Sequence, residues 1–169
     1  MEDRMTVTAG IGRSGWTLAL VWTGSVLLGA WLGIRNAPVW TPLLEAAARS
    51  SLRAGSCLIA ASSALAMTVL GWLLAGRLAV WLICPAEALS FGMLLGGCSG
   101  LSGAPLMAAL LLFLPLLKAP VLLMLWSAML RGKGSFSPPA VWKAIGVLGI
   151  LAAADAGLVS PFLTEVMNF

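Results

Sequence analysis

Long apolar runs constrain this chain more than any other feature of its sequence. Residues 16–34 and 56–75 contain no charged residue, and each approaches the roughly 20 residues that a membrane-spanning helix requires. Of the 169 residues, 60% are hydrophobic and 9% are charged, whereas a soluble domain is about one quarter charged. We therefore predict an all-α, multi-pass transmembrane helical bundle that forms a single integral membrane domain over residues 1–169.

About five spanning helices are predicted, joined by short connections and one longer connector. Their bounds follow the apolar runs: 16–34, 56–75, 78–98, 105–130 and 144–162. In the connector, residues 35–55, Thr41 is followed by Pro42, which predicts a helix start because a capping hydroxyl precedes a proline at the first helical position. This short helix either lies on the membrane surface or packs outside the membrane against the bundle.

Lys and Arg are unevenly divided between the two sets of connections. The first set, made of the amino-terminal tail, the 76–77 turn and the 131–143 loop, carries Arg4, Arg13, Arg77, Arg131, Lys133 and Lys143, and the second carries Arg35, Arg49 and Arg53. Cytoplasmic connections of membrane proteins are the ones enriched in Lys and Arg. The distribution predicts a protein of the cell membrane with its amino terminus in the cytoplasm and its carboxyl terminus outside.

Three ionisable residues fall inside the predicted spans: Glu87, Lys118 and Asp155. At about 1.5 Å per residue they lie roughly 13, 20 and 16 Å from the predicted starts of their helices, which is a similar depth in a bilayer core about 30 Å thick. A charge at that depth costs at least a few kcal/mol unless it is paired or hydrated. Lys118 is therefore predicted to neutralise either Glu87 or Asp155. Three roles are open for this cluster: a structural ion pair, a site for a partner's membrane helix, or an ion or proton pathway.

The third predicted span ends in closely spaced glycines. Gly92, Gly96 and Gly100 recur every four residues, a spacing that allows a neighbouring helix to approach to backbone contact. Gly29 and Gly33 give the first span a close-packing face of the same kind. We predict that the third span is central in the bundle, and that its glycines form the surface on which a partner assembles.

Missing residue types exclude several kinds of chemistry. The sequence has no histidine, which excludes imidazole catalysis, histidine-ligated metals and Ser-His-Asp triads. Its cysteines, Cys57, Cys84 and Cys98, lie singly within apolar runs, as is typical of small packing residues. The net charge of +4 lies in the connections and accompanies no nucleic-acid-binding motif. We predict no catalytic, cofactor-binding or metal-binding residues and no nucleic-acid partner.

The run WLICPAEALSFGMLLGG, followed by PLMAALLLFLPLLKAPVLLMLWSAML, resembles the stage II sporulation protein M type. In that family a helix ending in a Gly-rich turn precedes an apolar helix with a proline in its middle, here Pro115. The resemblance covers residues 49–131, and residues 89–92 match only the tail of the signature expected before the turn. It implies a bacterial, non-enzymatic scaffold that holds peptidoglycan hydrolases at the septal membrane during engulfment.

Two functions follow from these observations. The first is a non-enzymatic membrane scaffold or assembly protein, with the lipid bilayer and other membrane or cell-wall-associated proteins as partners and a role in sporulation. The alternative is a small transporter, channel or substrate-binding membrane subunit that uses Glu87, Lys118 and Asp155. Pro115 and Pro120 favour the alternative, because each removes a backbone donor and broken helices at the membrane midplane are where transporters bind their substrates.

Overall fold

Every element of the computed structural model is helical over the residues that it describes, which are 13–49, 53–101, 105–131, 138–159, 161 and 165. The α-helices are α1 (Arg13–Arg35), α2 (Ala37–Arg49), α3 (Arg53–Ala75), α4 (Arg77–Gly97), α5 (Pro105–Arg131) and α6 (Pro138–Ala154). A 3₁₀-helix, η1 (Cys98–Leu101), follows α4, and a π-helix, η2 (Asp155–Val159), follows α6. The predicted all-α helical bundle is confirmed.

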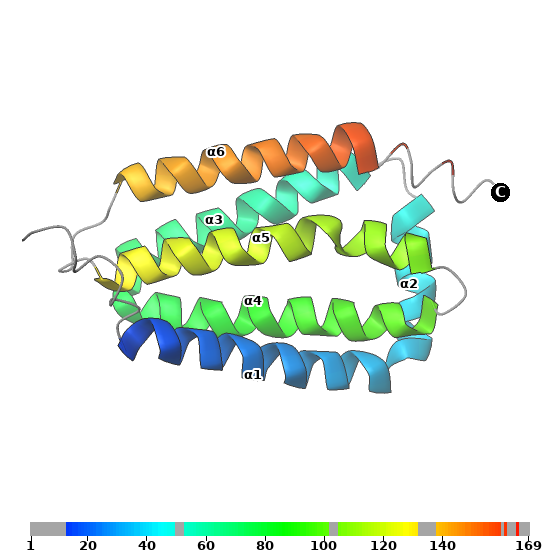
Figure 1. Ribbon diagram of the computed structural model, residues 1–169, viewed down its shortest axis with the longest axis horizontal. Helices are drawn as coiled ribbons and strands as arrows, with labels where there is room; N and C mark the ends of the chain where they lie inside the picture. Colours follow the sequence, from blue (N-terminus) through cyan, green and yellow to red (C-terminus); the bar gives the residue numbers. More distant parts are fainter. Residues whose placement is uncertain are drawn as a thin grey trace, which may run out of the picture.

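Five of the helices lie lengthwise and correspond in order to the five predicted spans (Figure 1). In Figure 1, α1, α4 and α6 run in one direction, α3 and α5 run in the other, and α2 lies across the end at which α1 finishes. The start of α1, the turn between α3 and α4, and the passage from α5 to α6 therefore share one end of the bundle. These are the three places to which sequence analysis assigned the larger set of basic residues.

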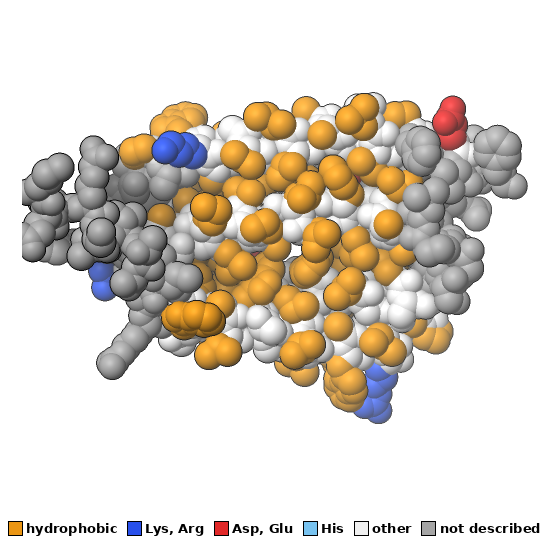
Figure 2. Space-filling model, viewed as in Figure 1, with side chains coloured by type: hydrophobic (Ala, Val, Ile, Leu, Met, Phe, Trp, Pro, Cys, Tyr) orange, Lys and Arg blue, Asp and Glu red, His pale blue; other side chains and the backbone are white. Residues whose placement is uncertain are grey.

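Within the described part of the chain, four helices are long and apolar enough to cross a membrane: Gly15–Arg35, Arg77–Gly100, Ala108–Leu130 and Val141–Val159. The fifth lengthwise helix, α3, has 23 residues, and its described apolar stretch is Ser62–Ala75. Figure 2 shows hydrophobic side chains over the middle of the visible face, with Lys, Arg, Asp and Glu near its two ends. This distribution fits a bundle whose flanks face lipid, because a charged side chain is costly in hydrocarbon.

One apolar core joins the five lengthwise helices. Among the described residues, the buried side chains of this core are Leu18, Ala64, Trp72, Val80, Cys84, Leu122, Leu125, Trp126, Met129, Val141, Ala144 and Leu148. Trp126 of α5 is 0% exposed, and its ring centroid lies 5.8 Å from that of Trp22 of α1. Every lengthwise helix contributes at least one buried residue to this core, which therefore joins the five helices.

A buried hydrogen bond fixes Trp126 within this core. The indole Nε1 of Trp126 donates to Oγ1 of Thr68 at 3.2 Å, and Thr68 Oγ1 donates in turn to the Ala64 carbonyl at 2.8 Å. A polar group in an apolar interior is costly unless it is hydrogen-bonded, and this arrangement gives both the indole and the hydroxyl a partner. This link was not predicted from the sequence.

The turn between α3 and α4 depends on Gly76. Its φ is 57° and its ψ is −130°, a conformation that glycine adopts far more readily than residues with a Cβ. The Gly76 N–H donates to the Trp72 carbonyl at 2.8 Å, and its carbonyl accepts from the Ala79 N–H at 3.2 Å. The predicted tight turn at residues 76–77 is confirmed.

The connector helix α2 begins earlier than predicted. It starts at Ala37, and the carbonyl of the preceding residue, Asn36, accepts a hydrogen bond from the backbone N–H of Trp40 at 3.2 Å. Thr41 Oγ1 donates to the Ala37 carbonyl at 2.8 Å, which is a bond within the helix. The prediction that Thr41 caps this helix is therefore wrong, and Pro42 lies inside α2 at the loss of one backbone hydrogen bond.

α2 packs on the end of the bundle, in contact with η1 and α4. Leu44 of α2 and Cys98 of η1 form the buried centre of a second apolar cluster, in which Trp40 and Leu94 are partly buried. This contact with the end of the bundle is compatible with both predicted arrangements, a helix on the membrane surface and a helix outside the membrane.

The last long helix also begins earlier than predicted. α6 starts at Pro138, six residues before the predicted bound at 144, and its α-helical part ends at Ala154 instead of continuing to 162. Proline is favoured in the first helical turn, where its missing N–H has no intrahelical acceptor. The bounds 144–162 are therefore wrong at the start, and the continuation over 155–159 is a π-helix.

Candidate functional site

Helices α1 and α4 lie in backbone contact along the glycines of both. A Cβ placed on Gly92 would overlap the carbonyl oxygen of Val26, and one placed on Gly96 would overlap the carbonyl oxygen of Ala30. The same holds from the other side, where a Cβ on Gly33 would overlap the carbonyl oxygen of Met93. Only glycine permits this separation, so the predicted close-packing faces of the first and third spans pack against each other.

This contact corrects the prediction that the α4 glycines form the surface on which a partner assembles. Gly92 and Gly96 are buried by α1 of the same chain, and a Cβ on Gly100 would meet the side chain of Thr41 in α2. The spacing predicted close helix packing correctly. It could not identify the neighbour, because an internal helix and a partner's helix place the same demand on the sequence.

Glu87 and Lys118 form an ion pair between α4 and α5. Lys118 Nζ lies 2.9 Å from Glu87 Oε2, within hydrogen-bonding distance, and the two side chains are 18% and 17% exposed. The pair neutralises two charges that would each be costly in the apolar interior of a membrane. Of the two carboxylates that sequence analysis left open for Lys118, the structure selects Glu87.

Asp155 belongs to a different element from this pair. It is the first residue of η2, is 0% exposed, and belongs to an element that packs against α3 and α5. Asp155 is about 21 Å from the start of its candidate span at Val141, and Glu87 is about 15 Å from the start of its candidate span at Arg77. The common depth of the three charges in a bilayer stays a prediction.

Three glycines of α6 and η2 have no packing neighbour among the described residues. No described atom outside the helix would lie within 4 Å of a Cβ on Gly146, Gly149 or Gly157. At about 100° per residue, these positions and exposed Ala153 share one face, which we call the α6 small-residue face. It lies inside the candidate span Val141–Val159. Sequence analysis missed this face, although the four-residue spacing from Gly149 through Ala153 to Gly157 is a signal for it.

The cysteines and acidic residues form no other site in the described part of the chain. Cys84 and Cys98 are buried and unbonded to one another, and Cys57 lies outside the described side chains. Among the described residues, no three Cys, Asp or Glu side chains gather closely enough to hold a metal ion.

Comparison with protein families, with curated proteins and with solved structures gave no match to this chain.

Proposed function

We propose that this protein is a non-enzymatic membrane scaffold that holds a partner protein through the partner's transmembrane helix. The α6 small-residue face carries this proposal. Small residues at the surface of a membrane helix let a second backbone approach closely, and van der Waals packing then drives association within the bilayer.

The internal α1–α4 contact shows how this chain uses glycine elsewhere. At Gly29, Gly33, Gly92 and Gly96 a Cβ would strike the backbone of the neighbouring helix, so each glycine is explained by the fold. At Gly149 the described part of the fold supplies no such reason, because none of its atoms outside the helix would lie within 4 Å of a Cβ there. An external helix with its own small-residue face would fill that space in the way that α1 fills the groove of α4.

Other observations bear on the nature of the partner. The α6 small-residue face lies inside the candidate span Val141–Val159, so an occupant of this face within the bilayer must itself be a membrane segment. The resemblance to the stage II sporulation protein M type adds the expectation that the partner is a membrane or cell-wall-associated protein. A role in bacterial sporulation and engulfment rests on that resemblance alone.

Gly149→Leu is expected to separate folding from partner binding. The substitution adds a bulky side chain where no described neighbour lies, so abundance in the membrane should stay at the wild-type level while crosslinking to the partner falls at least severalfold. Both quantities can be measured in one membrane sample, by immunoblotting and by photocrosslinking from a residue of the same face.

Gly24→Leu provides the matched control for this experiment. Gly24 of α1 is also exposed and free of neighbours among the described residues, but it lies on another helix. It should lose neither abundance nor crosslinking. Equal crosslinking in all three proteins would contradict the scaffold proposal, and crosslinks joining two copies of this chain would replace the partner with a homodimer.

The proposal includes an orientation, with the amino terminus in the cytoplasm. It is supported by the grouping of the start of α1, the α3–α4 turn and the passage from α5 to α6 at one end of the bundle, combined with the larger number of basic residues at that end. Topology reporters inserted in residues 132–137 and fused after Phe169 should report the cytoplasm and the outside, respectively. Signals from the same side would contradict five spans.

The alternative, a transporter or channel, has weaker support from the same residues. Lys118 and Glu87 satisfy each other directly at 2.9 Å, and α5 is helical without interruption through Pro115 and Pro120. Transporter sites at the membrane midplane are formed by interrupted helices, whose free backbone groups bind the substrate. An uninterrupted helix with a closed ion pair favours a structural role for this pair, which fixes how α4 and α5 align.

A further inference from the structure

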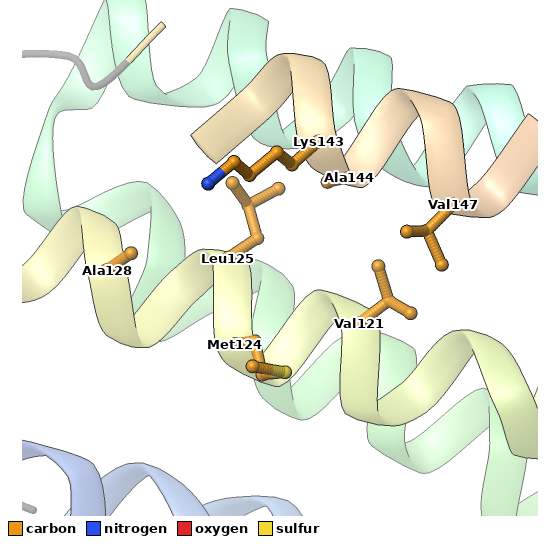
Figure 3. A pocket seen from close by; sticks show the side chains of 7 residues that line it. All are labelled: Val121, Met124, Leu125, Ala128, Lys143, Ala144 and Val147. Atoms are coloured by element: carbon orange, nitrogen blue, oxygen red, sulfur yellow. The ribbon is translucent and has the colours of Figure 1, made fainter. Parts of the chain in front are cut away.

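A groove of about 340 Å³ runs between α5 and α6 (Figure 3). Val121, Met124 and Ala128 are among the residues that line it from α5, and Ala144 and Val147 line it from α6. Ligand-binding clefts begin at about 300 Å³, so the space exceeds a packing defect. From Val121 to Ala128 the groove follows α5 for about 10 Å, parallel to the helices.

Lys143 provides the charged group of this otherwise apolar lining. Figure 3 shows its side chain extending from α6 past Leu125 toward the beginning of α6, while Val121 and Val147 lie at the other end of the groove. The ammonium group therefore lies at one end of the apolar groove. Among the described residues no carboxylate forms a salt bridge with it.

The depth of Lys143 matches that of lipid headgroups. The candidate span begins at Val141, two residues earlier, and the adjacent Trp142 is 70% exposed, as is common for indoles at the membrane–water interface. In a bilayer this arrangement places the ammonium group near the phosphates of one leaflet and the apolar part of the groove beside the acyl chains. It also lies at the end of the bundle that carries the larger set of basic residues.

We propose that this groove binds an anionic phospholipid, with one acyl chain between α5 and α6 and its phosphate paired with Lys143. Charge complementarity and depth select this occupant over an apolar partner helix, because an apolar helix would leave the ammonium group unpaired. The groove lies on a different side of α6 from the small-residue face, since Ala144 and Val147 point toward α5 and Gly149 does not contact it. Lipid binding and partner binding can therefore fail independently.

Lipid preference can be measured on the detergent-purified full chain by native mass spectrometry with equal amounts of phosphatidylglycerol and phosphatidylcholine of identical acyl chains. We expect a roughly fivefold preference for phosphatidylglycerol, the ratio that corresponds to about 1 kcal/mol for one basic residue near an anionic lipid surface. K143Q should abolish the preference and K143R should retain it. R35Q removes an exposed charge at the last residue of α1, which lies at the opposite end of the bundle from the start of α6, and should leave the preference unchanged.

Further arms of the experiment separate the apolar groove from its charged end. A128F fills the groove from α5 and should lower retention of both lipids, and glycerol phosphate without acyl chains should not bind. An absent preference in the wild type, or equal loss in K143Q and R35Q, would overturn the proposal. So would protein-to-protein crosslinks from position 147, because they would show that another chain occupies the groove. Thermal midpoints of each variant in phosphatidylcholine exclude general unfolding as the cause of a loss.

Discussion

Gly96→Leu is expected to remove most of the folded protein from the membrane. Even a Cβ at this position would overlap the carbonyl oxygen of Ala30 and lie 2.8 Å from the backbone nitrogen of Ile34. The obstructing atoms belong to the backbone of α1, so no side-chain rotation can make room and the two helices must separate. Overpacking a core costs about 1–3 kcal/mol where side chains can adjust, and we expect a cost at or above the upper end here.

The measurement is membrane abundance together with the thermal midpoint in detergent, for Gly96→Leu beside Gly149→Leu. Both variants add the same side chain to a glycine in a candidate span, but only Gly96 has a backbone opposite it. Wild-type abundance and stability for Gly96→Leu would show that α1 and α4 do not touch as described. Equal losses in both variants would point to a general intolerance of bulk.

Much of this fold follows from local signals in the sequence. The lengthwise helices come from apolar runs whose lengths match a bilayer, and the α3–α4 turn comes from Gly76, whose backbone conformation favours glycine. The start of α2 was misplaced because Pro42 was interpreted as the first helical position, and the start of α6 because its predicted bound followed the apolar run. In the structure Pro42 lies inside one helix and Pro138 begins the other.

The candidate sites depend on which helices are neighbours, and the sequence does not specify this. Glycine spacing predicted close packing for Gly96 but not that α1 fills the groove. The same spacing at Gly149 indicates an external contact only because no described atom outside the helix lies beside this glycine. Lys143 was counted as one more basic residue of a connection, since its relation to the α5–α6 groove exists only in three dimensions.

Lys118→Met is expected to destabilise the bundle strongly by leaving the Glu87 carboxylate without its cation. Removing one partner of a buried ion pair costs about 3–5 kcal/mol because the remaining charge stays desolvated. The side chains of this pair are 17% and 18% exposed, so water that reaches the site would reduce the loss toward the lower end of that range. Lipid against the bundle would keep it near the upper end. Denaturation of purified protein in mixed detergents measures the change.

Double variants then identify the carboxylate. Lys118→Met combined with Glu87→Gln replaces the pair by neutral groups of similar size. The double variant should therefore lose about 0.5–3 kcal/mol less stability than the sum of the two single losses. Lys118→Met combined with Asp155→Asn should be additive, because the ion pair of Lys118 is with Glu87. Recovery with Asp155→Asn instead of Glu87→Gln would contradict the observed pairing. Additivity in both doubles would mean that Lys118 and Glu87 contribute to stability separately, and the alignment of α4 with α5 would then depend on apolar packing in the Trp126 core and in the second apolar cluster.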